Sequence, residues 1–133
     1  MAKPPLILVV EDTAELREDL ALELTEAGYS VCEAQDGSEA LACLGEGMPQ
    51  LILCDIQLPK ADGLEFVAKV RETLDCGSQL PVIFMSAFSD HGLREQARLL
   101  GISHFLVKPI DYDALLGLIA RVLARPGGPP EVE

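Results

Sequence analysis

Five polar side chains stand at the ends of short apolar runs, and their chemical types suit phosphoryl transfer. They comprise three carboxylates, a hydroxyl and an ammonium: Glu11, Asp12, Asp55, Ser86 and Lys108. Carboxylate oxygens are the hard ligands that Mg²⁺ takes, and water and phosphate oxygens usually complete its octahedron. A hydroxyl and an ammonium can hold the remaining phosphoryl oxygens, which supplies positioning and charge stabilisation for in-line transfer.

Asp55 is the member of this set best suited to act as a nucleophile. It follows the central apolar run, and a carboxylate can form an acyl phosphate. Three carboxylates brought together repel one another, and Lys108 alone cannot neutralise them. We therefore expect a divalent cation, Mg²⁺, among Glu11, Asp12 and Asp55.

The elements that must position these side chains are short apolar runs that alternate with segments of helical periodicity. The runs are rich in Val, Ile, Leu or Phe and are bounded by Gly, Pro or Asp: Leu6–Val10, Tyr29–Ala34, Leu51–Cys54, Val82–Met85 and His104–Val107. This pattern favours buried parallel strands over half-exposed antiparallel ones. Leucines four residues apart, at 16, 20 and 24, are typical of the single-faced helices expected between the runs.

Two local signals mark boundaries in this pattern. Thr13 and Asp111 are expected to be N-caps, because their side-chain oxygens can accept hydrogen bonds from the first turn of a helix. Asp36-Gly37 is interpreted as a turn.

Strand and helix alternate five times, which predicts an α/β fold. We expect a doubly wound, flavodoxin-like sheet of five parallel strands with five helices on both faces, because right-handed crossovers place them there. In such sheets the ligand site lies at the carboxyl ends of the strands, so the polar side chains should meet at one edge. A chain of 133 residues suits one domain, expected over residues 4–124. Residues 125–133, with three Pro and two Gly, are expected to form a tail or the start of a linker.

Composition excludes several classes of function. A net charge of −12 repels a phosphate backbone or an anionic membrane, so we expect no direct nucleic-acid binding and no membrane partner. The apolar runs are too short for a membrane helix or a signal peptide, which predicts a cytoplasmic protein. The cysteines contain no C-x-x-C pair and are interpreted as reduced, mostly buried thiols: Cys32, Cys43, Cys54 and Cys76.

Four motifs in a characteristic order make the chain resemble the receiver domain of bacterial two-component response regulators. They are the acidic pair at 11–12, the segment CDIQLP at 54–59 with Gly63 behind it, MSA at 85–87 and VKP at 107–109. The likeness extends from LILVVED near the N-terminus through the last helix. Each motif alone is weak, but four together at these spacings form a specific signal.

The resemblance implies roles for the acidic side of the site. Asp55 corresponds to the phosphoacceptor, Glu11 and Asp12 to Mg²⁺ carboxylates, and the backbone carbonyl of Gln57 to a further metal ligand. The domain would catalyse its own phosphorylation and dephosphorylation without being a conventional enzyme. Gln57 and Phe88 stand where the family tunes hydrolysis, and a bulky Phe88 predicts slow loss of the phosphoryl group because it excludes water.

The resemblance also implies roles for the residues that sense the phosphoryl group. Ser86 and Lys108 would bind its oxygens, and the Lys108–Pro109 peptide would be cis, as the family usually has it. Phe105 stands at the position of the switch aromatic, although an apolar run is also where a core aromatic belongs. Ser86 replaces the commoner Thr, which keeps the donor oxygen but leaves χ1 less restricted.

The partners implied by the resemblance are a phosphodonor and a downstream target. The donor would be a sensor histidine kinase or a histidine phosphotransfer protein, docking on the first helix. The output surface would combine the fourth helix, fifth strand and fifth helix, near residues 91–100, 104–107 and 111–123, and would meet an output domain or protein. A homodimer through the face of the fourth helix is a further expectation.

Three other readings come from different classes of protein. A dehalogenase-type phosphatase also uses a nucleophilic Asp with Mg²⁺, but it has a D-x-D motif and Asp55-Ile56-Gln57 lacks the second acid. A flavodoxin-like cofactor binder would share the architecture, yet the chain has no Trp and no phosphate loop after its first run. A pseudo-receiver that acts as an interaction module without being phosphorylated is the main alternative, although such domains typically lose part of the residue set retained here.

Overall fold

The apolar runs form the strands of one parallel sheet. The computed structural model describes residues 4–58, 63–73, 80–87, 90–102 and 104–124. Within these residues, five strands alternate with five helices: β1 (Leu6–Val10), α1 (Ala14–Glu26), β2 (Ser30–Ala34), α2 (Gly37–Glu46), β3 (Leu51–Asp55), α3 (Gly63–Thr73), β4 (Val82–Ser86), α4 (His91–Leu99), β5 (His104–Val107) and α5 (Tyr112–Leu123). The strands are ordered β2-β1-β3-β4-β5 and every pairing is parallel. The predicted α/β fold is confirmed.

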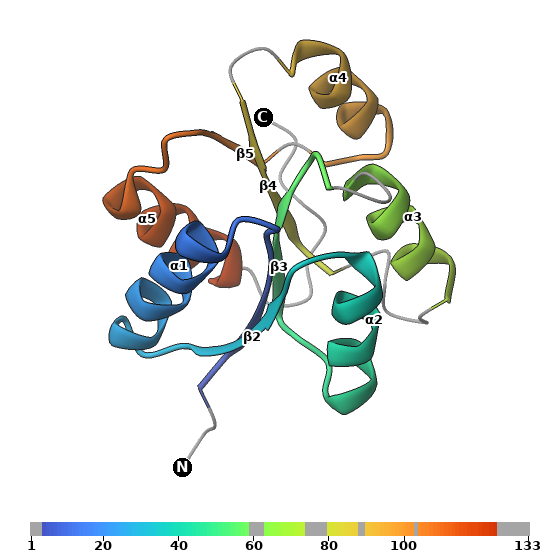
Figure 1. The fold of residues 1–133 in the computed structure, drawn as a ribbon. Coiled ribbons are helices and arrows are strands. Elements are labelled where there is room, and N and C mark those ends of the chain that lie inside the picture. Colours follow the sequence, from blue (N-terminus) through green and yellow to red (C-terminus); the bar gives the residue numbers. More distant parts are fainter. Residues whose placement is uncertain (1–3, 59–62, 74–79, 88–89, 103, 125–133) are drawn as a thin grey trace.

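Helices cover both faces of this sheet (Figure 1). α1 and α5 pack on one face, where Leu20, Leu24, Leu115 and Ile119 meet alternate residues of the strands. α2, α3 and α4 pack on the other face around a second apolar cluster, to which α3 contributes most. Because both faces are covered, the central strands β3 and β4 are buried along their whole length, which explains their continuous apolar sequence.

The ends of several elements differ from the sequence-based expectation by one residue. Asp55 and Ser86 are the last residues of their strands rather than the first residues beyond them. Asp36-Gly37 was interpreted as a turn, and this is wrong, since Asp36 caps α2 by accepting a hydrogen bond from the Glu39 N–H at 2.9 Å. Asp followed by Gly is a signal for both structures, and only the following residues distinguish them.

The two expected N-caps behave differently. The Asp111 side chain accepts a hydrogen bond from the Ala114 N–H at 3.2 Å, as expected of a cap. Thr13 is the N-cap residue of α1, but its side chain makes no capping hydrogen bond. Its own N–H instead donates to Glu11 Oε2 at 3.0 Å, so the entry into α1 is tied to an acidic side chain of the predicted site.

The cysteines depart from the expectation of reduced thiols. Cys32 of β2 and Cys43 of α2 form a disulfide, with their Cα atoms 6.5 Å apart. The spacing of 11 residues did not indicate a pair, because the contact arises only when α2 folds back over β2. Cys54 of β3 is buried and is not part of a disulfide, as expected, and Cys76 lies outside the described residues.

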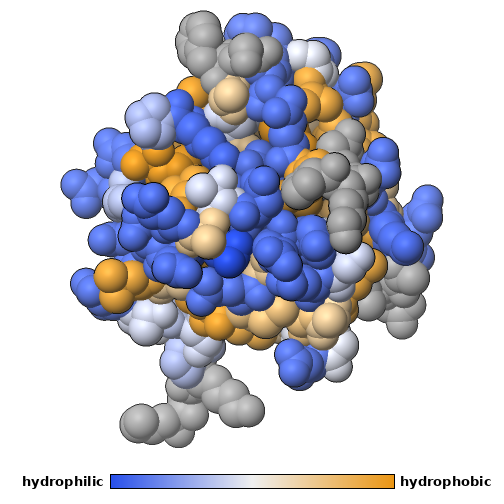
Figure 2. Space-filling view, viewed as in Figure 1, coloured by the Kyte–Doolittle hydropathy of each residue, from blue (hydrophilic) through white to orange (hydrophobic). Residues whose placement is uncertain are grey.

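The surface reflects the acidic composition. Figure 2 shows hydrophilic side chains over most of the face seen in Figure 1, with apolar side chains in patches between them. Several large apolar side chains among the described residues are exposed, most of all Leu99 at 81%. None of the described helices has the length and apolar character needed to cross a membrane.

Candidate functional site

The strand register brings the predicted site residues to one edge of the sheet. Cys54 pairs with Val10, so Asp55 at the end of β3 lies beside Glu11 directly after β1. On the other side, Asp55 pairs with Met85 and Ser86 pairs with Val107. The carboxyl ends of β1, β3, β4 and β5 therefore meet at the same place, as the doubly wound topology requires.

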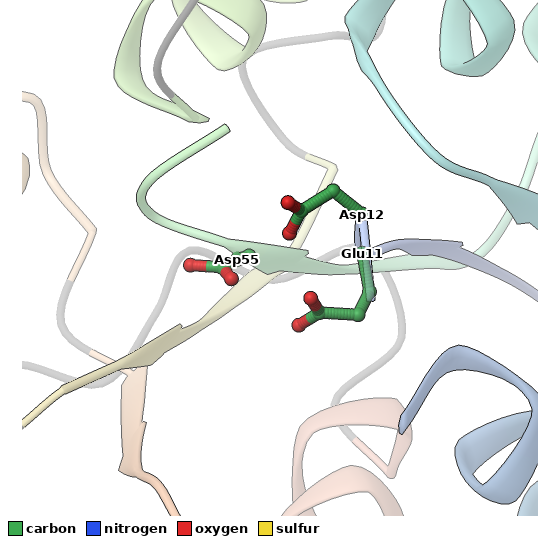
Figure 3. Close-up of side chains that lie close together, drawn as sticks. All are labelled: Glu11, Asp12 and Asp55. Carbon is green, nitrogen blue, oxygen red and sulfur yellow. The ribbon is translucent and has the colours of Figure 1, made fainter. Parts of the chain in front are cut away.

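Three carboxylates form the centre of this site. One oxygen from each of Glu11, Asp12 and Asp55 lies within 4.8 Å of the others. In Figure 3 the carboxylates of Glu11 and Asp12, which come from the end of β1, point to the same side toward Asp55 on β3. Glu11 is fully buried and Asp55 is 7% exposed, whereas Asp12 is exposed. The cluster is thus open to solvent on the Asp12 side.

Lys108 supplies a positive charge to this cluster. Its Nζ donates a hydrogen bond to Asp55 Oδ2 at 2.7 Å and forms an ion pair with Glu11 Oε1 at 2.9 Å. Burial alone lowers the pKa of Lys108, but its hydrogen bonds to Asp55 and Glu11, together with the negative charges of these two carboxylates, outweigh burial and raise the pKa. The ammonium is therefore charged at neutral pH. The peptide bond between Lys108 and Pro109 is cis.

The Asp55 carboxylate is held at both oxygens. Oδ2 accepts from Lys108, and Oδ1 accepts from the backbone N–H of Gln57 at 2.9 Å. Gln57 itself is exposed directly beyond the strand. Two donors with different directions fix the plane of the carboxylate.

Glu11 is fixed from the opposite side. Its backbone N–H donates to Ala34 O at 2.9 Å, which extends the pairing of β1 with β2. Its backbone oxygen accepts from Arg17 Nη1 of α1 at 2.8 Å, and Arg17 Nε lies 3.6 Å from Glu33 Oε1 of β2. The buried Glu11 side chain consequently has little freedom to move away from Asp55.

The charge of this cluster favours a divalent cation. Three carboxylates outnumber the single ammonium, so the uncompensated charge is negative. Partial desolvation first, and then the hydrogen bond and charge of neighbouring Glu11, raise the pKa of the Asp12 carboxyl. Carboxylate oxygens at these separations suit Mg²⁺, so the donor set fits the expected metal.

Gly63 permits the close packing behind Asp55. A Cβ atom at this position would lie 2.5 Å from the Asp55 backbone oxygen, 3.0 Å from the Phe84 ring and 3.1 Å from Ile56 Cα. The Gly63 N–H also donates to Ile56 O at 2.9 Å. The first turn of α3 is thereby pressed against the end of β3, which only glycine allows.

The residues expected to sense a phosphoryl group lie on the β4 and β5 side. Ser86 is fully buried, and its backbone oxygen accepts from the Lys108 N–H at 2.9 Å. Phe105 is half-buried, with its ring centroid 6.4 Å from that of Phe84 and 5.7 Å from the Arg98 guanidinium carbon. Phe88 lies outside the described residues.

Three contacts at the site were not found by sequence reasoning. Arg17 supports the backbone of Glu11, the buried Asp90 carboxylate accepts from the Ala87 N–H at 2.8 Å, and Arg94 approaches Ser86. Charged residues are common in the first turns of helices, so nothing in their local sequence distinguishes them. Only the crossing of α1 and α4 over the strand ends makes them neighbours of the site.

Comparison with known proteins identifies a family for nearly the whole fold. The family model described as the response regulator receiver domain matches residues 7–120. Response regulator Rre1 of Synechocystis is 36% identical over 126 residues, which cover 94% of this chain and 54% of the relative. Transcriptional regulatory protein PdtaR of Mycobacterium tuberculosis is 34% identical over 125 residues, covering 93% of this chain and 59% of the relative. The chain thus spans little more than half the length of these relatives.

Solved structures of the same type share the fold. A putative response regulator from Chloroflexus aurantiacus superposes with a TM-score of 0.84 and 32% identity, covering 92% of this chain and all of that one. The chemotaxis response regulator CheY4 of Vibrio cholerae gives a TM-score of 0.79 and 29% identity, covering 90% and 98%. These similarities extend over the sheet and its helices alike.

Proposed function

Because the chain belongs to the response regulator receiver domain family, we propose that it is a phosphorylation-dependent signalling switch. Asp55 accepts the phosphoryl group, and the donor is a sensor histidine kinase or a histidine phosphotransfer protein. The observation that carries the proposal is the Asp55 carboxylate, held by Lys108 at 2.7 Å inside a cluster of acidic oxygens.

The residues suit an in-line transfer. An Asp55 oxygen attacks phosphorus, the bond from phosphorus to the donor nitrogen breaks, and the imidazole leaves with that electron pair, so Asp55 becomes an acyl phosphate. Lys108, already charged and 2.7 Å from Asp55, stabilises the negative charge on the phosphoryl oxygens. Ser86 offers its hydroxyl to a third oxygen.

Mg²⁺ belongs to this proposal as the cofactor. Glu11, Asp12 and Asp55 would hold it through carboxylate oxygens, with the backbone carbonyl of Gln57 as a further ligand. When bound, it neutralises the acidic cluster and polarises the phosphoryl group for attack. The protein's own part is to keep the carboxylates together against their mutual repulsion, through buried Glu11 and its support from Arg17.

The output of the switch is assigned to the β5 side of the molecule. Phosphorylation would draw Ser86 toward the phosphoryl group, and Phe105 would turn inward behind it. Phe105 is half-buried beside Arg98 of α4, so a rotation of its ring would change the surface made by α4, β5 and α5. That surface would meet an output domain or protein.

The remaining partners follow from exposed apolar residues and charge. Leu22 of α1 is 56% exposed, which suits docking of the phosphodonor on this helix. Leu99 and Val107 are exposed on the α4 and β5 face, where a homodimer would form. The net charge of −12 argues against direct nucleic-acid binding by this domain.

The lifetime of the phosphoryl group is assigned to two positions. Gln57 is exposed two residues after Asp55, where it can guide water, and Phe88 is proposed to exclude water from the same site. Replacing either side chain with Ala should change the rate of dephosphorylation. An unchanged half-life in both Gln57→Ala and Phe88→Ala would contradict this assignment.

The test of the proposed function is intact mass after incubation with Mg²⁺ and acetyl phosphate. The protein should gain one phosphoryl mass, whereas the Asp55→Asn variant should gain none and EDTA should abolish the gain. If neither acetyl phosphate nor a panel of histidine kinases modifies the protein, the pseudo-receiver reading replaces the switch, and the acidic cluster then binds metal alone or serves as a structural remnant.

A further inference from the structure

The side chain of Arg94 on α4 reaches the end of β4, beside Ser86. Its Nη1 lies 3.4 Å from Ser86 Oγ and 3.5 Å from Ala87 O. Both distances are at the long end of the hydrogen-bond range, so the guanidinium lies beside these groups without a strong bond to either. Ser86 is fully buried at the end of β4, whereas Arg94 is half-buried on the helix that follows.

The position of Arg94 is fixed by the start of α4. The Ala87 N–H donates to Asp90 Oδ2 at 2.8 Å, and the Asp90 N–H donates back to Ala87 O at 3.0 Å. The backbone N–H of Arg94 donates to the Asp90 backbone oxygen at 3.0 Å. These reciprocal bonds tie the helix to the end of β4, and the Arg94 side chain returns over Ser86 as a consequence.

His91 holds the guanidinium from its outer side. Arg94 Nη2 lies 2.7 Å from His91 Nδ1, one helical turn away. The guanidinium is thus fixed between an imidazole at the surface and a buried hydroxyl at the strand end. A side chain ordered in this way loses less conformational freedom when it binds an anion than a free surface arginine does.

Transfer of a phosphoryl group to Asp55 changes the charge balance of the site. A divalent cation and Lys108 together balance Glu11, Asp12 and Asp55. Transfer to Asp55 removes its carboxylate charge but adds a phosphoryl group with a charge of about −2, which leaves about one negative charge uncompensated. Arg94, beside Ser86 Oγ, is a cation on the side of the site opposite to Glu11.

We propose that Arg94 binds the phosphoryl group on Asp55 together with Ser86, as a second cation beside Lys108. The inference rests on the proposed function and deepens it. A guanidinium presents several N–H donors in one plane and matches the oxygens of a phosphoryl group better than an ammonium does. Because Arg94 belongs to α4, this contact also links the phosphoryl group directly to the helix of the output surface.

Beryllofluoride, a stable analogue of the phosphoryl group, provides the test. Its affinity for the Mg²⁺-loaded protein is measured by calorimetry for wild type, Arg94→Gln and Arg94→Lys. Arg94→Gln should weaken binding roughly 10-fold, and Arg94→Lys should weaken it less, because it keeps the charge but loses the planar donors. The control is Lys69→Gln at an exposed position of α3. It also removes one positive charge, and it should change the affinity for beryllofluoride less than about twofold.

Two further readouts separate phosphoryl binding from a structural role. Adding salt should weaken beryllofluoride binding more in wild type than in Arg94→Gln, because the variant has lost a charged contact. The affinity for Mg²⁺ alone should not fall in Arg94→Gln, since the guanidinium repels a cation. A loss of thermal stability in this variant with an unchanged salt dependence would mean that Arg94 only supports α4.

The outcomes distinguish this inference from the function beneath it. The proposed role of Arg94 is wrong if Arg94→Gln binds beryllofluoride as well as wild type does. It is also wrong if Lys69→Gln loses as much affinity as Arg94→Gln. Neither result contradicts the proposed phosphorylation switch. If wild type neither binds beryllofluoride nor gains a phosphoryl mass, the switch itself is wrong and the role of Arg94 falls with it.

Discussion

The site has two halves that are built differently. The acidic half rests on β1 and β3. Lys108 and the backbone N–H of Gln57 hold the Asp55 carboxylate, and Arg17 holds the backbone oxygen of Glu11. The sensing half rests on β4, β5 and α4. β5 is an edge strand with half-buried residues, and Ala97 is the one described residue of α4 that is buried.

This difference separates chemistry from response. Two of the carboxylates proposed to hold a cation, Glu11 and Asp55, are buried at the ends of central strands, where close packing limits their movement. Phe105 of the sensing half lies instead on an edge strand and is half-buried, where fewer apolar contacts oppose its movement, and such regions open at low cost in free energy.

The two phenylalanines that pair across β4 and β5 give the largest expected contrast. Phe84 is fully buried and Phe105, its register partner, is half-buried. Phe84→Ala should lower the free energy of unfolding by about 3–5 kcal/mol, and Phe105→Ala by about 1 kcal/mol. Denaturant titration of both variants measures this, and equal losses would show that the edge strand β5 is packed as tightly as the central strand β4.

Gly63 tests how tightly the acidic half is packed. Gly63→Ala places a Cβ atom 2.5 Å from the Asp55 backbone oxygen, and should cost about 3 kcal/mol and weaken Mg²⁺ binding. Gly92→Ala in α4 is the matched control, because a Cβ there meets nothing within 4 Å. It should be neutral or add about 0.5 kcal/mol of stability. If Gly63→Ala keeps the stability of wild type, the backbone at the end of β3 can move to make room for the added methyl group.

The disulfide between Cys32 and Cys43 extends the rigid region to β2, which supports Glu11 through Ala34. Closing a loop of this size restricts the unfolded chain, so reduction should lower the free energy of unfolding by about 2 kcal/mol. Denaturant titration with and without reductant measures the loss. The Cys32→Ser/Cys43→Ser double variant should show no response to reductant, and a full response from it would assign the effect to another thiol.

Asp12 gives the smallest expected effect and a dependence on pH. Because folding raises the pKa of this carboxyl above its ordinary 3.8, its charged form destabilises the metal-free protein, and the penalty is absent below that pH. Asp12→Asn should therefore stabilise the metal-free protein by less than about 1 kcal/mol, a gain that develops as pH rises above 4. With saturating Mg²⁺, wild type should become more stable than Asp12→Asn, since only wild type is stabilised by the metal. Thermal melts over pH with and without Mg²⁺ show whether this crossover occurs.

Much of the fold and of the site could be predicted from the sequence because its signals are local. Apolar runs with Gly, Pro or Asp at their ends placed all five strands to within one residue at each end. Polar residues at the ends of those runs, such as Asp55 and Lys108, identified the edge that carries the site. Alternation of strand and helix implied the doubly wound sheet, since right-handed crossovers leave few other arrangements.

Other features were decided by tertiary structure, because they depend on how distant elements pack. Cys32 and Cys43 meet only where α2 lies on β2, and the crowding at Gly63 exists only where α3 begins against β3. The half-burial of Phe105 follows from β5 being at the edge of the sheet, which apolar periodicity does not report. Arg94 lies beside Ser86 because two hydrogen bonds between Ala87 and Asp90 fix the start of α4 at the end of β4. Residue type and spacing thus determined which chemistry the chain carries, whereas the packing of helices on the sheet determined which side chains can act on it together.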